Sequence, residues 1–235
     1  MMIRNRCLRA TLEALFTATD AVREYMVLMA LLLVLCLVSL PGKSYFFFIS
    51  QDLVPTAFNI MAVGGFITGL FFSIRKGLSV SDREAIGGIW IWLKEEKVEA
   101  KEIWTGAVIP AVLHVLFLTA LMIPFILITG SLSGVSAERI PGTVLVIVLL
   151  MIFFRSASLF LAVVTGGRLF ASTMVTGALL FLVFLGTSGF SRTYNPVVML
   201  LSGEGVYVPA CVYGFSGAVL FLLLRIPLKR RKIQQ

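Results

Sequence analysis

Long apolar runs separated by short polar stretches dominate the sequence. A membrane-spanning helix needs about 20 consecutive, mostly apolar residues. Six runs meet this requirement, at residues 25–47, 54–74, 105–129, 143–165, 169–190 and 206–224. The pattern predicts an all-α membrane protein with six transmembrane helices, in a domain that covers residues 25–224.

The N-terminal stretch before the first run has an amphipathic pattern. In residues 8–24, five apolar side chains share one face of a helix. They are Leu8, Leu12, Leu15, Phe16 and Val22. This predicts that residues 1–24 form an amphipathic helix lying in the membrane interface, with a frayed tail as the alternative.

The longest polar stretch, residues 75–104, lies between the second and third runs. Ser81 and Glu84 have the spacing of a capping box, which predicts a helix beginning at Asp82. Lysines and glutamates then form neighbouring stripes along a second helical run. The stretch is either a solvated connector or a docking surface for a cytoplasmic partner.

Composition and charge agree with a membrane protein. Hydrophobic residues make up 59% of the chain and charged residues 14%, whereas soluble domains average about 25% charged. The net charge of +8 is spread between the apolar runs, which argues for membrane orientation and against nucleic-acid binding. With the N-terminus inside, sixteen Lys or Arg residues lie on the inner side and three, Lys43, Arg139 and Arg192, on the outer side. This predicts a multi-pass protein of the cytoplasmic (inner) membrane with both termini in the cytoplasm, including the basic tail at 225–235.

One tripeptide raises the question of nucleotide binding. Gly42-Lys43-Ser44 matches the end of a phosphate-binding loop, but Leu37 stands where the first glycine of that loop belongs. The predicted orientation also places the tripeptide on the outer side, away from ATP. Three scattered cysteines and a single histidine indicate neither a disulfide framework nor a metal site. We therefore expect no metal, no cofactor and no catalytic residue in this chain.

Arg155 lies near the middle of the fourth run. A charge at the bilayer centre costs about 2.5–3.5 kcal/mol on insertion scales. One interpretation is that Arg155 faces a substrate path or a subunit interface and binds negative charge. The other is a structural arginine, either hydrogen-bonded to nearby backbone and to Ser156 or Ser158, or reaching toward the membrane interface from a tilted helix. The sequence leaves both open.

His114 and Ser188 together suggest an intramembrane serine protease, but their depths disagree. Ser188 is near the outer end of the fifth run, and His114 lies about 15 Å from the inner side at 1.5 Å per residue. The remaining separation of roughly 10–15 Å exceeds the reach of a nucleophile–base pair. We expect His114 instead to make a polar contact with Asn59 or Thr119.

Small residues and turn formers predict two further features. Gly65 and Gly69 have the spacing that lets membrane helices approach closely. The stretch NPVVMLLSGEGVYVPA, residues 195–210, is apolar yet rich in Gly and Pro. It predicts a short helix that caps the outer end of the bundle, with an ordinary loop as the alternative.

Four short motifs stand at particular places in this pattern. The motif DREAIGG supplies Arg83, Glu84 and Gly88, and TGAVIPA begins the third run. Near the outer ends of the last two runs, GTSGF supplies Ser188-Gly189 and YNPVVMLLSGEG supplies Asn195-Pro196. With these motifs the chain resembles the permease subunits of ABC exporters of the ABC-2 class.

The resemblance implies an exporter-type transmembrane domain that works as a dimer of identical or paralogous permeases in the lipid bilayer. A separate ABC ATPase subunit would bind ATP and Mg²⁺. Its coupling site would include Asp82, Arg83, Glu84, Gly88, Trp90 and Trp92. The pathway or interface would include Arg155, His114 and Asn59, and the outer cap would include Ser188, Gly189, Asn195 and Pro196.

Two other functions compete with this expectation. An integral-membrane enzyme, either an intramembrane protease or a lipid-modifying transferase, would use paired carboxylates or clustered histidines at the membrane face. A noncatalytic membrane assembly factor would share the fold and carry no substrate. The sequence does not identify a transported substrate.

Overall fold

Every secondary-structure element of the described chain is a helix. The computed structural model describes residues 5–39, 56–80, 98–165, 173–177, 193–202 and 207–233. The elements are α1 (Arg6–Leu12), the π-helical turn η1 (Glu13–Thr17), α2 (Thr19–Ser39), α3 (Thr56–Val80), α5 (Ala100–Leu132), α6 (Arg139–Thr165), α9 (Pro196–Ser202), α10 (Tyr207–Leu223) and α11 (Arg225–Ile233). The predicted all-α class is confirmed for these residues.

Five helical stretches in the described chain are long and apolar enough to cross a membrane. They are Thr19–Ser39, Thr56–Arg75, Ala100–Leu132, Arg139–Thr165 and Tyr207–Arg230. They correspond to five of the six predicted spans, and they show a multi-pass membrane protein. The predicted span at 169–190 falls largely outside the described residues, as do Gly42-Lys43-Ser44 and the coupling residues 82–92.

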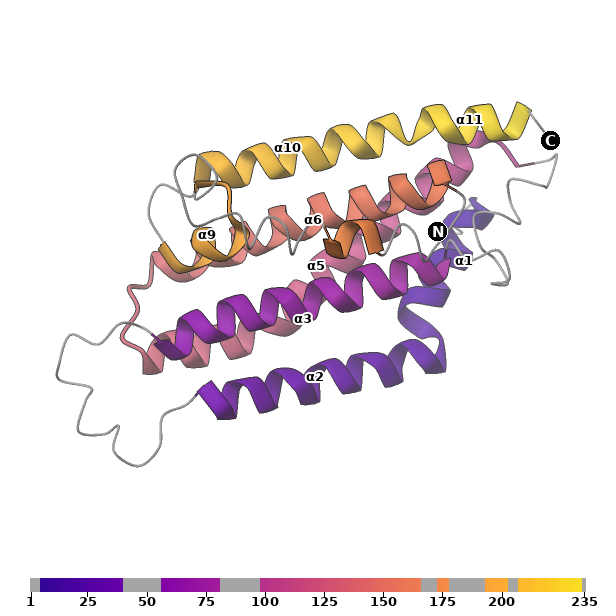
Figure 1. Cartoon of the computed structure of the whole chain (residues 1–235). Helices are drawn as coiled ribbons and strands as arrows, with labels where there is room; N and C mark the ends of the chain where they lie inside the picture. The colour runs from indigo at the N-terminus through magenta and orange to yellow at the C-terminus, as the bar shows by residue number, and fades with distance from the viewer. Residues whose placement is uncertain are drawn as a thin grey trace.

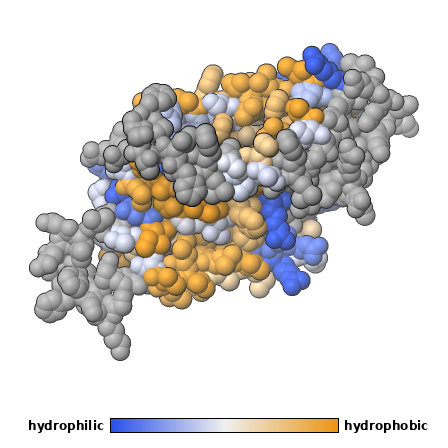
Figure 2. Space-filling model, viewed as in Figure 1, coloured by the Kyte–Doolittle hydropathy of each residue, from blue (hydrophilic) through white to orange (hydrophobic). Residues whose placement is uncertain are grey.

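On the face of the bundle seen in Figure 2, hydrophobic residues occupy much of the coloured surface between the two ends, as expected of a surface that faces lipid. Large hydrophobic side chains on α2 and α10 are well exposed, including Met26 at 68%, Val38 at 76% and Phe215 at 73%. Soluble monomers rarely expose apolar patches larger than a few hundred Å². The exposed side chains therefore mark the faces that contact lipid or another membrane chain.

The long helices lie side by side, and α6 and α10 run in the same direction (Figure 1). The order of their contacts shows this directly. A Cβ added to Gly142 would meet the side chain of Tyr207, and one added to Gly217 would lie 3.0 Å from the Cα of Phe153. Residue numbers thus rise together along the two helices. Close approach of the backbones at Gly217 is possible because glycine has no side chain.

The two ends of the bundle carry different short elements. At one end, α1 and α11 lie beside the last turn of α6 and the first turn of α5; we call this the terminal end (Figure 1). The other end carries α9 beside the starts of α3 and α6, and we call it the distal end. Thr165 thus closes α6 at the terminal end, whereas Asn195 precedes α9 at the distal end.

The N-terminal stretch differs from the single amphipathic helix predicted over 8–24. Helix α1 ends at Leu12, and a π-helical turn leads to Ala18, whose backbone is extended with ψ 138°. Helix α2 then begins at Thr19, six residues before the predicted start of the first span. The acidic Asp20 in its first turn favours a helix start here, because it complements the positive end of the helix dipole.

Helix α1 is docked against α5, with a different face buried from the one predicted. Cys7 and Thr11 are buried, while Leu8 and Leu12 are only partly so. A Cβ added to Gly106 of α5 would lie 2.6 Å from the Cβ of Cys7. The missing side chain at Gly106 therefore makes the space that α1 occupies. In this structure the helix packs on protein at the terminal end.

The central core lies between α2, α3, α5 and α6. Phe58, Phe66 and Phe154 are among its largest fully buried side chains. At Gly69, where the sequence predicts close helix packing, the end of the Met122 side chain from α5 fills the space beside the glycine. It lies 2.1 Å from the position that an added Cβ would take. Helix α5 continues through Pro110, one of its two internal prolines.

Candidate functional site

Arg155 is a buried cation in the middle of α6. Its side chain is 3% exposed, and within the described residues its Nε and Nη1 atoms have no hydrogen-bond partner. The hydroxyls of Ser156 and Ser158 donate instead to the backbone carbonyls of Phe153 and Arg155, at 2.8 and 2.9 Å. The interpretation of a guanidinium held by these two serines is therefore not what the structure shows.

Tyr25 of α2 lies within electrostatic range of this guanidinium. Its hydroxyl donates a hydrogen bond to the carbonyl of Leu15 in the π-helical turn. The Tyr25 ring is 5.9 Å from the ring of His114, centroid to centroid. Tyr25 of α2 thus lies beside His114 of α5 and within electrostatic range of Arg155 of α6.

His114 is fully buried among aromatic rings. Besides Tyr25, it meets Phe16 edge to face, with a centroid distance of 6.2 Å. Thr119 and Asn59, the partners that the sequence predicts for His114, make hydrogen bonds to other groups. The Thr119 hydroxyl donates to the carbonyl of Val115, and the Asn59 side chain accepts from Arg139 at the distal end.

An apolar groove on the lipid-facing surface lies next to Tyr25. It has a volume of about 480 Å³ and runs between the first turns of α2 and the middle of α5. Its lining is Phe16, Val22, Tyr25, Met26, Met29, Phe117 and Leu121. Tyr25 therefore lines this groove.

Arg139 organises the distal end. Its Nη2 donates to the Oδ1 of Asn59 at 3.0 Å and to the carbonyl of Leu201 at 2.8 Å, and its guanidinium lies 5.2 Å from the centre of the Phe58 ring. One side chain thus joins the starts of α3 and α6 to the end of α9. Sequence reasoning counted Arg139 only as an outer-loop charge and missed this role.

Asn195 and Pro196 begin the short helix α9. The Oδ1 of Asn195 accepts hydrogen bonds from the backbone N–H groups of Val197 and Val198, at 2.8 and 3.2 Å. Asparagine is a favoured N-cap, and proline is favoured at the first helical position. The predicted short helix in this stretch is confirmed, and its role as a cap stays a prediction. Ser188 and Gly189 lie outside the described residues.

The terminal end is fastened by Trp104 near the start of α5. Its Nε1–H donates to the carbonyl of Phe221 in α10 at 2.7 Å, and the guanidinium of Arg225 lies 4.0 Å from its ring centre. Asn5 ties α1 to the same turn, because its Nδ2 donates to the carbonyl of Glu102 at 3.0 Å. The last turn of α10 and the segment before α1 are thus both bound to the first turns of α5.

Arg9 and Glu13 form an exposed ion pair at this end. The Nε of Arg9 and a carboxylate oxygen of Glu13 are 2.8 Å apart, and both side chains are more than half exposed. The hydrogen bond that Arg9 donates to Glu13, together with the negative charge of that carboxylate, raises the pKa of Arg9 above its usual value. Among the described residues, no group of three or more His, Cys, Asp or Glu is placed to hold a metal ion.

Comparisons with known proteins add no assignment. The sequence matches no protein-family model and no curated protein. A functional proposal therefore depends on the topology of the bundle and on the placement of its charged residues.

Proposed function

We propose that the chain is the permease subunit of an ATP-driven ABC exporter, which forms a substrate pathway as a dimer and couples to a separate ATPase. The observation that carries the proposal is topological: the termini and both ends of the coupling segment meet at the same end of the bundle. The motif resemblance of residues 82–92 adds to it. No covalent chemistry is assigned to this chain.

The parallel arrangement of α6 and α10 supports a sixth crossing. Helix α6 ends at the terminal end, and α9 and α10 begin at the distal end. The chain between Thr165 and Asn195 must therefore pass from one end to the other, and it is longer than the roughly 20 residues that a spanning helix needs. We place this crossing at the apolar run 169–190. An even number of crossings puts both termini on one side of the membrane.

Charge favours the terminal end as the cytoplasmic one. Basic residues concentrate in cytoplasmic loops and tails of membrane proteins. Helices α1 and α11 at the terminal end contain Arg6, Arg9, Arg225, Lys229 and Arg230. We infer that this end faces the cytoplasm of an inner membrane, where an ATPase has access to ATP and Mg²⁺.

The segment proposed to couple to the ATPase leaves and re-enters the bundle at this end. Helix α3 runs toward the terminal end and finishes at Val80, and α5 begins there at Ala100. Residues between them include Asp82, Arg83, Glu84, Gly88, Trp90 and Trp92. A soluble ATPase bound to this segment would therefore lie beside α1 and α11.

Contacts at the start of α5 offer a path for force into the bundle. Trp104 is the last residue of the proposed coupling segment, 75–104, and its side chain donates a hydrogen bond to the carbonyl of Phe221 in α10. Gly106, half a turn later, packs against α1. A push on the coupling segment would therefore move α1 and α10 together with α5. This mechanical link is the step by which closure of the ATPase would reorient the pathway.

Isolation of the native complex tests the proposal. The chain, tagged at its C-terminus, is extracted from its own membranes in mild detergent, and the co-purifying subunits are identified. We expect an ATPase with a complete phosphate-binding loop, lost from the double variant Arg83→Ala, Glu84→Ala and kept by the control Lys229→Ala. The isolation is repeated from membranes treated with a cross-linker, so that a weakly bound subunit is retained. If the wild-type chain then yields no ATPase, the proposal is overturned.

A further inference from the structure

Helices α10 and α11 form one continuous helical surface through the residue between them. The N–H of Leu224 donates to the carbonyl of Leu220 at 3.0 Å, and the N–H of Leu228 donates to the carbonyl of Leu224 at 3.3 Å. Both hydrogen bonds have the four-residue spacing of an α-helix. Side chains four residues apart therefore stay on the same face across the junction.

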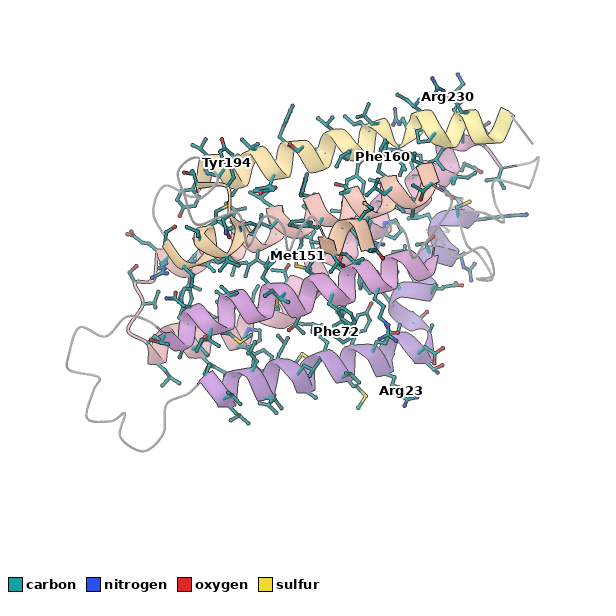
Figure 3. The ribbon with its side chains drawn as sticks, viewed as in Figure 1. Arg23, Phe72, Met151, Phe160, Tyr194 and Arg230 are labelled. Carbon is teal, nitrogen blue, oxygen red and sulfur yellow. The ribbon has the colours of Figure 1, made fainter. Side chains whose placement is uncertain are left out.

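One exposed row of side chains runs along this surface and changes from apolar to basic. Leu222 and Ile226 are 56% and 52% exposed, and Arg230, four residues further on, is exposed as well. Figure 3 shows Arg230 on the side of α11 that faces away from the other helices. Leu224 and Leu228 are buried and hold the helix to the bundle. The exposed row thus passes from a surface that suits hydrocarbon to one that suits negative charge.

The charge on α11 is basic throughout. Residues 225–232 read RIPLKRRK, with five basic residues and no acidic one. Arg225 and Lys229, which are also four residues apart, form a second exposed row beside Arg230. No carboxylate within this segment offsets the positive charge, so the segment can attract anions from outside the chain.

Trp104 of α5 indicates the depth of this charge in the membrane. The guanidinium of Arg225 lies 4.0 Å from the centre of its ring, and its Nε1–H donates to the carbonyl of Phe221. Tryptophan is enriched at the level of the lipid headgroups, where an apolar ring and a polar N–H both find partners. The candidate membrane span Tyr207–Arg230 also ends within α11. The cations of α11 therefore lie at the level of the lipid phosphates.

We propose that the last turn of α10 and helix α11 form a binding site for an anionic phospholipid. One acyl chain lies along Leu222 and Ile226, and the headgroup phosphate lies on the cations of α11. Basic clusters directly beside a membrane helix attract anionic lipids, and the apolar stems of lysine and arginine reach across the boundary between hydrocarbon and headgroup. A free phosphate would leave the apolar row unused, and a zwitterionic lipid would leave the charge of α11 uncompensated.

Lipid binding by the purified chain tests this without an ATPase, so the outcome is independent of the exporter proposal. The protein in a nonionic detergent is titrated with dioleoyl-phosphatidylglycerol. Dioleoyl-phosphatidylcholine is the zwitterionic control with the same chains, and glycerol phosphate is the chain-free control. Native mass spectrometry reports the fraction of protein with bound lipid.

Three double variants separate the charge of α11 from its fold. Lys229→Gln with Arg230→Gln removes two charges from the site. Arg9→Gln with Arg23→Gln removes the same charge from two exposed positions that lie outside α11. Lys229→Arg with Arg230→Lys keeps the charge of α11 and changes only the side chains that carry it.

The expected result is selective binding of phosphatidylglycerol. One basic residue near an anionic membrane surface strengthens binding about fivefold, so Lys229→Gln with Arg230→Gln should weaken it by about tenfold or more. The other two double variants should bind within about twofold of the wild type. Equal binding of the two lipids would overturn the proposal, and so would an equal loss in the variant of Arg9 and Arg23. Glycerol phosphate that binds as tightly as the lipid would overturn it as well.

Thermal unfolding separates lipid binding from a structural role of the two cations. In lipid-free detergent the variant Lys229→Gln, Arg230→Gln should unfold at the same midpoint as the wild type, because both side chains are exposed. Phosphatidylglycerol should raise the midpoint of the wild type and not that of the variant. An equal rise in both would contradict the proposal. A variant that keeps its lipid selectivity but loses the co-purifying ATPase would also contradict it, because α11 would then bind a protein partner.

Discussion

Gly217 is the point at which the parallel packing of α6 and α10 is most sensitive to a single methyl group. A Cβ at this position would lie 3.0 Å from the Cα and 3.1 Å from the N of Phe153. Ordinary van der Waals contacts of a Cβ are longer, and the two crowding atoms belong to a helix backbone that cannot rotate away. Gly217→Ala therefore forces the two helices apart.

The cost of this separation follows from two opposing terms. Overpacking in a well-packed core costs about 1–3 kcal/mol, and alanine gains about 1 kcal/mol over glycine in helix propensity. We expect Gly217→Ala to lower the free energy of unfolding by up to about 2 kcal/mol. Gly214→Ala is the matched control one turn earlier, where the added Cβ meets the end of the Leu149 side chain at 2.6 Å. That side chain can change rotamer, and the propensity gain is the same.

The assay is reversible unfolding of the purified protein in mixed micelles of dodecyl maltoside and SDS, followed by far-UV circular dichroism. The difference between Gly217→Ala and Gly214→Ala isolates the contact with the α6 backbone, because helix propensity cancels. Gly217→Ala should be the less stable of the two by about 1–3 kcal/mol. Equal stability of the two variants would refute the close contact between the two helix backbones at Gly217.

Further predictions concern the two ends of the bundle. Arg139→Ala should destabilise the protein by about 1.5–3 kcal/mol, the value of hydrogen bonds to a charged group. In unfolding measurements the effects of Arg139→Ala and Asn59→Ala should not add, and strict additivity would contradict the hydrogen bond between the two side chains. Asn195→Ala should cost about 1 kcal/mol through loss of the α9 cap, and hydrogen exchange of the α9 amides should rise; unchanged exchange would argue against the cap. Trp104→Phe should reduce transport more than ATPase binding, measured in proteoliposomes, because it removes the hydrogen bond to α10 and keeps the ring under Arg225; full transport would exclude this link. Arg9→Ala should change stability by less than about 0.5 kcal/mol, since exposed ion pairs contribute little, and a larger loss would show an unrecognised contact.

The apolar runs predict the architecture because burial in a bilayer leaves little choice of structure. Every backbone polar group must be bonded within its own segment there, so each run becomes a helix. The predicted start of the first span at residue 25 is wrong for a local reason. The prediction places Arg23 and Glu24 in an interfacial segment, although Thr19-Asp20 is itself a signal for a helix start.

The packing of α1 could not be predicted from its own sequence. Its pattern offers a leucine-rich face, yet Cys7 and Thr11 are the buried residues, because Gly106 of α5 leaves space for them. Such a choice depends on a partner helix about 100 residues away in the chain. The same holds for Arg139, whose partner Asn59 is 80 residues distant.

For Arg155 the sequence predicts two different roles. A charge in an apolar run is rare and indicates a site, but the choice between a structural and a ligand-binding role depends on the positions of the neighbouring side chains. In the structure the hydroxyls of Ser156 and Ser158 donate to backbone carbonyls and not to the guanidinium. Such contacts depend on side-chain rotamers and on how each helix is rotated about its axis, and a periodic sequence pattern does not encode either. Figure 3 shows the side chains of the described residues.

The sidedness of the terminal end tests the account most directly. In a variant with Cys7, Cys36 and Cys211 replaced, single cysteines at Glu99, at the terminal end, and at exposed Ser136, at the distal end, are treated with a membrane-impermeant maleimide. We predict that Ser136→Cys is labelled in intact cells and that Glu99→Cys is labelled only after the membrane is permeabilised. The reverse pattern would place the coupling segment out of reach of any ATPase and would contradict the proposed function.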